Sequence, residues 1–146
     1  MSIFPTNILL ATDGSPEATL AASTAVQLSG ATNSDLHVVF VMHPREHLLS
    51  EDEILAAYDA KAAQEETERA VDYMVEEIGS AGGAVARTHL RRGTPDAEIV
   101  ALAEELASGL IVMGSRGRGG LRRSLMGSVS DSVIRHAHCA VLVVRE

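Results

Sequence analysis

The sequence predicts an α/β protein with one doubly wound, Rossmann-like sheet of five parallel strands, in the order 3-2-1-4-5 and with helices on both faces. Two observations lead to this prediction. Short apolar runs alternate with amphipathic segments along the chain, and no hairpin turn signal separates successive apolar runs. Continuous apolar strands joined by helices are typical of parallel sheets buried on both faces, with right-handed crossovers. We expect a single domain over residues 1–146.

The first apolar run, Asn7–Thr12, predicts a buried strand that leads into a turn and a helix. Ser15 is suited to the N-cap, and Pro16 to the first helical position, where a missing N–H costs nothing. The alanine-rich stretch 17–29 continues this helix. Gly30 is the expected left-handed residue at its C-terminal end.

The second apolar run, Asp35–Met42, predicts a strand that ends at His43-Pro44. From Glu51 onward, apolar residues recur every three or four positions with acidic residues between them, which predicts a long amphipathic helix. The pattern allows a break before Ala60. We expect the helix to end at Gly79 or Gly82.

Residues Ala84–Leu90 alternate enough to predict a third strand. Thr94 as N-cap and Pro95 at the first position then begin another helix. A fourth buried strand is predicted over Leu110–Met113. The helix between these strands has an apolar stripe of Ile99, Leu102, Ala103 and Leu106. Gly109 is expected to end this helix.

The last two elements are a helix over Ser128–His138 and a fully apolar strand over Ala140–Val144. In the helix we expect Val129, Val133 and Ile134 to face inward. In the predicted order the last strand lies at the edge of the sheet, and an uncovered apolar edge is a template for pairing. We therefore expect a homodimer in which residues 141–144 of two copies pair about a two-fold axis. The alternative is a monomer whose own elements cover this edge.

Composition narrows the classes of function. The net charge is −8 and aromatic residues make up only 3% of the chain, which argues against nucleic acids as partners. Seven of the twelve Lys and Arg residues nevertheless lie between Arg87 and Arg123, a distribution that suits a small phosphorylated ligand. The single cysteine, Cys139, fits a reducing compartment, and the sequence has neither a signal pattern nor an apolar run of membrane-spanning length. We expect a cytoplasmic protein without a membrane partner.

The stretch that follows Met113 is rich in glycine and arginine and ends where the helix at Ser128 begins. Glycine lets backbone N–H groups approach a ligand, and a helix N-terminus presents unpaired N–H groups and a positive dipole end. We expect Ser128 to be the N-cap and this segment to bind an anion, most simply phosphate. The plain alternative is a flexible surface loop, with its arginines in solvent at positions 116, 118, 122 and 123.

The predicted strand order also places two distant segments together. Ligands of such sheets bind beyond the carboxyl ends of the strands, at the switch point of the strand order, which here lies between the first and fourth strands. Asp13 ends the first strand and Gly114 ends the fourth, so both would border one crevice. Taken alone, Asp13 reads more readily as a turn residue that caps the next helix, and its position at the predicted switch point is what favours a role in binding.

Two common phosphate motifs are absent from the glycine-rich segment. Gly120 and Leu121 stand where a P-loop needs Lys and Ser/Thr, and Arg122 occupies the third glycine position of a dinucleotide fingerprint. The spacing Gly114-x2-Gly117-x9-Gly127-Ser128 instead resembles, without a gap, the nucleotide-binding signature of the ATP-binding branch of the universal stress protein family. The resemblance covers the whole chain, from Ile8-Leu-Leu-Ala-Thr-Asp13-Gly-Ser to Cys139-Ala-Val-Leu-Val-Val144.

The resemblance implies a stress-response protein that binds ATP together with Mg²⁺. Asp13 would contact the ribose or its surroundings, and backbone groups of Val41 would contact adenine. Gly114 and Gly117 would line the ribose and phosphates, with Arg116 as the arginine that contacts phosphate. Backbone N–H groups of Gly127, Ser128 and Val129, and the Ser128 hydroxyl, would bind the phosphates. The Mg²⁺ would be held by the ATP phosphates, with Ser128 as the protein group within its reach.

Three functions are compatible with these residues. The first is a binding module whose conformation or partners depend on nucleotide. The second is a slow ATPase, although the sequence has no P-loop lysine and no residue placed to orient an attacking water. The third is an interaction protein whose loop is vestigial. A metal site made by the protein alone is not expected. Pro44 argues against a helix through the first close histidine pair, His43/His47, and the i,i+2 spacing of the second pair, His136/His138, puts its members on different faces of a helix.

Overall fold

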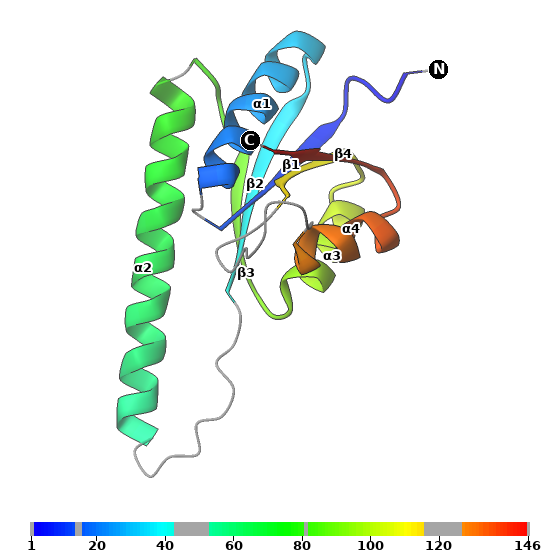
Figure 1. The fold of residues 1–146 in the computed structure, drawn as a ribbon. Coiled ribbons are helices and arrows are strands. Elements are labelled where there is room, and N and C mark those ends of the chain that lie inside the picture. Colours follow the sequence, from blue (N-terminus) through cyan, green and yellow to red (C-terminus); the bar gives the residue numbers. More distant parts are fainter. Residues whose placement is uncertain (1, 14–15, 43–52, 81, 116–126, 146) are drawn as a thin grey trace.

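The computed structural model describes residues 2–13, 16–42, 53–80, 82–115 and 127–145. Strands and helices alternate from one end of the chain to the other (Figure 1). The elements are β1 (Asn7–Thr12), α1 (Pro16–Thr32), β2 (Asp35–Met42), α2 (Glu53–Ser80), β3 (Arg87–Arg92), α3 (Pro95–Glu105), β4 (Ser108–Gly114), α4 (Ser128–His136) and β5 (Ala140–Val144).

The five strands form one sheet in the order β3-β2-β1-β4-β5, and every neighbouring pair is parallel. Ile8 of β1 lies opposite Leu36 of β2 on one side and Leu110 of β4 on the other. The predicted strand order is therefore confirmed. β3 and β5 are the edge strands.

Two apolar layers cover the sheet. On one face, Leu10 and Val38 of the sheet meet Ala21 and Ala25 of α1, with Ile78 of α2 beside them. On the other face, the sheet meets α3 and α4 through a second buried cluster of Leu9, Ala11, Val39, Ile99, Leu102, Ala103, Ile111, Met113 and Val133. Figure 1 shows α1 and α2 on one side of the sheet and α3 and α4 on the other. Alternate residues of β1 thus feed opposite cores, which is why this strand is apolar throughout.

Helix α2 runs without interruption from Glu53 to Ser80, so the break considered before Ala60 does not occur. Met74 and Ile78 are buried against the sheet, whereas Asp72 is exposed, as the amphipathic pattern predicts. Among the helices that the structure describes, none is long and apolar enough to cross a membrane.

The ends of α1 and α3 differ from the prediction, because non-glycine residues provide the left-handed conformation. Helix α1 continues past Gly30, and Asn33 has φ 55°, while Ser34 N–H bonds Ser29 O at 3.0 Å in the pattern of a Schellman motif. Asparagine tolerates this conformation through local hydrogen bonding of its side chain.

Helix α3 ends at Glu105, and the left-handed residue that follows is Ala107, with φ 51°. Gly109, predicted to end this helix, lies inside β4. Its N–H donates to Thr6 Oγ1 at 2.9 Å, and a Cβ on Gly109 would lie 2.7 Å from that oxygen. Close approach of the chain before β1, rather than helix termination, explains the glycine.

The edge strand β3 begins and ends later than the predicted strand Ala84–Leu90. Its pairing with β2 extends to Arg91 and Arg92, charged residues that resemble a loop in the sequence but are common on edge strands.

In α4, Val133 is fully buried and Val129 packs against the core as predicted, but Ile134 is 45% exposed. The helix ends at His136, two residues before the predicted end. Ser15, predicted as the N-cap of α1, and His43-Pro44, predicted to end β2, lie outside the described residues.

Candidate functional site

The switch point of the sheet lies at the carboxyl ends of β1 and β4. These strands are neighbours, and the helices that follow them, α1 and α4, cover opposite faces. Chain segments that leave in opposite directions open the crevice in which ligands of doubly wound sheets bind. Asp13 directly follows β1 and is half-buried, and Gly114 is the last residue of β4. The structure therefore brings together, at the carboxyl ends of neighbouring strands, two residues that are about a hundred positions apart.

Ser115, directly after β4, connects the elements around this switch point. Its N–H donates to Val144 O at the end of β5, at 3.0 Å. Its carbonyl oxygen accepts hydrogen bonds from Gly127 N at 2.6 Å and from Ser130 Oγ at 2.8 Å, both at the start of α4. The chain that leaves β4 at Ser115 therefore returns to the same point at Gly127. This closure brings the N-terminus of α4 to the carboxyl end of β4.

Helix α4 presents its first N–H groups at this position. Gly127 is the N-cap, with the extended φ and ψ of −65° and 152°, so Ser128 is the first helical residue and not the predicted N-cap. The hydroxyl of Ser130, in the first turn of the helix, lies 3.0 Å from Gly127 O. The helical ladder starts with Asp131 N–H donating to Gly127 O at 3.0 Å. The N–H groups of Ser128, Val129 and Ser130 precede that bond and face the end of the helix.

The predicted site residues fall into three groups. Ser128 and Val129 contribute N–H groups of the first turn, whereas the Gly127 N–H is already donated to Ser115. Val41 lies near the end of β2 and is half-buried against the α3 and α4 core. Arg116 and Gly117 lie outside the described residues.

Packing against α1 explains the glycine at position 114. A Cβ at this position would lie 3.0 Å from Glu17 Cβ and 3.2 Å from the Glu17 carbonyl carbon. Contacts under 3.4 Å to backbone cannot be relieved by a side-chain rotation, so any other residue would push away the first turn of α1. The glycine lets α1 pack directly on the end of β4.

Sequence reasoning missed Glu17, a buried polar residue that contacts Ser115 at this site. It is only 6% exposed, and its Oε2 accepts a hydrogen bond from Ser115 Oγ at 2.7 Å. In the sequence, Glu17 reads as an ordinary acidic residue in the first turn of α1, where the helix dipole favours negative charge. Its burial depends on contact with a residue 98 positions away, which no local pattern reveals.

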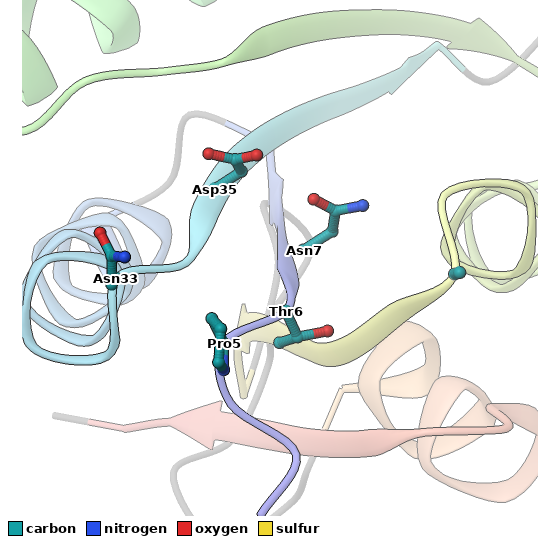
Figure 2. A pocket seen from close by; sticks show the side chains of 6 residues that line it. Pro5, Thr6, Asn7, Asn33 and Asp35 are labelled. Carbon is teal, nitrogen blue, oxygen red and sulfur yellow. The ribbon is translucent and has the colours of Figure 1, made fainter.

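The hollow shown in Figure 2 lies at the opposite end of the strands, near the amino ends of β1 and β2. It has a volume of about 340 Å³ and is lined by Pro5, Thr6, Asn7, Asn33, Asp35 and Ala107. Asn7 already donates its amide N–H to Leu106 O at 2.8 Å, and Thr6 Oγ1 accepts from Gly109 N–H. Two of these side chains thus hold neighbouring backbone in place, and none belongs to the predicted nucleotide site.

A histidine pair that the sequence did not suggest joins β2 to β3. His37 Nδ1 and His89 Nε2 are 3.1 Å apart, while the ring centres are 5.3 Å apart. The ring planes are inclined by 26°, and at this nitrogen separation one ring donates a hydrogen bond to the other. Burial lowers the pKa of both histidines below the ordinary value of 6.5. In the described part of the chain, no group of three or more His, Cys, Asp or Glu side chains is arranged to hold a metal ion.

Cys139 is half-buried, and burial raises the pKa of its thiol. A thiol with a raised pKa is a weak nucleophile, because the reactive form is the thiolate. Both observations favour a structural role for this cysteine over a nucleophilic one.

Comparison with known proteins assigns the family. The universal stress protein family profile matches residues 5–145. A universal stress protein of Methanocaldococcus jannaschii is 32% identical over 139 residues, which cover 95% of this chain and 81% of that protein. The structure of a universal stress protein from Lactobacillus plantarum is similar with a TM-score of 0.83 at 27% identity, covering 99% of this chain and all of that one. A universal stress protein in complex with cAMP shares the fold at 24% identity and a TM-score of 0.62, covering 97% and 98%. The chain therefore belongs to the universal stress protein family.

Proposed function

We propose that this protein binds ATP with Mg²⁺ at the carboxyl ends of β1 and β4, and that the nucleotide changes its conformation or partners during stress. The observation that supports this proposal best is the start of α4. Three N–H groups, of Ser128 to Ser130, face the end of a nine-residue helix that Ser115 holds at the switch point. Unpaired N–H groups and the positive dipole end of a helix favour phosphate at such a position.

Each residue of the proposed site has a role that follows from its place. The N–H groups of Ser128 and Val129 would bind phosphate oxygens, with the Ser128 hydroxyl close to the Mg²⁺ that those oxygens carry. Asp13, at the end of β1, would accept hydrogen bonds from the ribose. Backbone groups of Val41, on the neighbouring strand β2, would contact adenine. Gly114 and Gly127 would allow close approach, and Arg116 and Gly117 of the intervening segment complete the proposed set.

A proline at position 128 provides a sharp test. Ser128 is the first helical residue, where proline fits, and Gly127 has the extended conformation that the residue before a proline prefers. Ser128→Pro therefore removes one N–H from the proposed phosphate site without breaking α4. Ser128→Ala is the matched control, because it removes the hydroxyl and keeps the N–H.

Calorimetric titration with Mg-ATP measures the outcome. We expect the wild type to bind, Ser128→Ala to bind somewhat more weakly, and Ser128→Pro to lose roughly ten- to hundredfold in affinity, as for loss of a hydrogen bond to a charged group. Equal affinity of Ser128→Pro and the wild type would remove α4 from the site. Steady phosphate release by the wild type would favour a slow ATPase, and no binding of ATP or cAMP would favour an interaction protein with a vestigial loop.

We further propose that two copies form a homodimer through β5 in the cytoplasm, a reducing compartment that suits the single Cys139. β5 is an edge strand, and residues Val141–Val144 are half-buried and apolar. The opposite edge, β3, instead carries Arg87, Arg91 and Arg92, charges of the kind that block edge-to-edge pairing. Antiparallel pairing of two β5 strands about a two-fold axis would close the assembly.

A further inference from the structure

The buried carboxylate of Glu17 is linked to the start of α4 through a single residue. Glu17 and Ser115 are 6% and 5% exposed, and the hydrogen bond between Ser115 Oγ and Glu17 Oε2 is 2.7 Å long. A buried carboxylate is costly unless hydrogen bonds compensate for the water it loses. The Ser115 hydroxyl provides such compensation, and in return its side chain is held in one rotamer.

The backbone of the same serine holds the N-terminus of α4. Its carbonyl accepts from Gly127 N and Ser130 Oγ, and its N–H donates to Val144 O. All the hydrogen-bonding groups of Ser115 are therefore engaged, one with α1, one with β5 and one with α4. A change in the direction of this residue would move the carbonyl that positions Gly127, and with it the first turn of α4.

Helix α1 also packs directly against the end of β4, next to Ser115. The first turn of α1 lies so close to β4 that a Cβ on Gly114 would be 3.0 Å from Glu17 Cβ. Glu17 therefore lies where the first turn of α1 packs on the end of β4. From this position its side chain reaches the hydroxyl of Ser115.

We propose that Glu17 is a positioning residue of the nucleotide site. It does not contact the ligand; its carboxylate orients Ser115, and Ser115 sets the position of the N–H groups of Ser128 and Val129. This inference rests on the proposed function, because it assigns those N–H groups to phosphate. The role requires an oxygen acceptor at position 17, not a negative charge.

Three variants separate positioning from simple stabilisation. Glu17→Gln keeps an oxygen that accepts from Ser115, Glu17→Leu removes the acceptor at similar volume, and Ser115→Ala removes the donor. Ser108→Ala is the matched control, since Ser108 is a serine of similar burial, 7% exposed, at the other end of β4. The measurement is calorimetric titration with Mg-ATP, at a temperature at which each variant is folded by circular dichroism.

We expect Glu17→Leu and Ser115→Ala each to weaken binding by about tenfold, and Glu17→Gln and Ser108→Ala to bind within about twofold of the wild type. The double variant Glu17→Leu with Ser115→Ala should lose no more than either single variant, because the two residues act through one contact. Wild-type affinity in folded Glu17→Leu would overturn the proposal, as would additive losses. A Gln variant as weak as the Leu variant would also overturn it, since charge would then be the requirement.

Amide hydrogen exchange at Gly127 in ligand-free protein keeps this inference separate from the proposed function. We expect faster exchange of the Gly127 N–H in Glu17→Leu and in Ser115→Ala, but not in Glu17→Gln or Ser108→Ala. A wild type that binds no nucleotide would refute the proposed function and, with it, the role of Glu17 in binding. Unchanged Gly127 exchange in both Glu17→Leu and Ser115→Ala would refute the positioning contact, whatever the wild type binds.

Discussion

Two buried serines at the ends of one strand should respond to alanine substitution in opposite directions. Ser108 is the first residue of β4, and Ser115 directly follows its last. Both side chains are more than nine-tenths buried. Ser115 Oγ donates to the buried Glu17 carboxylate, whereas Ser108 Oγ is buried with no hydrogen-bond partner among the described residues. The same change therefore removes a charged hydrogen bond at one end and an unpaired hydroxyl at the other.

The magnitudes follow from these contacts. A hydrogen bond to a charged group contributes ~1.5–3 kcal/mol, so Ser115→Ala should lower the free energy of unfolding by about 2 kcal/mol. For a chain of this length, that loss corresponds to a decrease in melting temperature of about 4–8 °C. Ser108→Ala loses no bond and removes a buried polar group, so it should leave stability unchanged or raise it by up to ~1 kcal/mol.

Urea unfolding followed by circular dichroism measures the difference. Equal m-values in the three proteins would show that the midpoints report stability alone. We expect the midpoint to order as Ser108→Ala at or above the wild type, and Ser115→Ala well below it. A loss of more than about 1 kcal/mol in Ser108→Ala, or less than about 0.5 kcal/mol in Ser115→Ala, would refute this reading of the hydrogen bonds.

Three further outcomes are expected. Ala107→Gly removes the strain of an alanine in the left-handed conformation, and Gly30→Ala places a better helix former in α1 where a Cβ meets open space. Each change should raise the free energy of unfolding by about 0.5–1 kcal/mol in urea titrations. A loss of stability in either variant would contradict the assigned conformations. Because burial lowers the pKa of His37 and His89, the unfolded chain binds protons more readily, and stability should fall as pH drops through 6.5 towards the lowered values. His89→Gln should flatten that dependence of the melting temperature, and an unchanged slope would exclude the pair as its cause. In sedimentation velocity the wild type should have twice the 15.4 kDa chain mass and Val143→Lys the single mass; a variant that stays dimeric would place the interface elsewhere.

The sequence by itself determined the topology and most strand positions. Asn7–Thr12 and Asp35–Met42 were predicted with the bounds that the structure shows, since apolar runs between polar turns leave few alternatives in a sheet covered on both faces. Thr94 and Pro95 likewise begin α3 as predicted. Thr94 is the N-cap without a side-chain cap hydrogen bond, and the fixed φ of Pro95 is a property of the residue itself. Right-handed crossovers predicted a doubly wound sheet, and the predicted strand order was confirmed.

Only the tertiary structure decided which residues meet around the candidate site. Ser115 and Glu17 are 98 residues apart, and the joint they form is invisible to any local pattern. The same applies to Gly109, whose role became evident only beside Thr6, and to His37, whose partner lies 52 residues away on an edge strand. Helix ends were mispredicted for a related reason, because Asn33 and Ala107 adopt the left-handed conformation in place of the glycines nearby. Where the chain stops a helix depends on how the next strand must enter the sheet, and long-range packing outweighs the small local preference of glycine for that position.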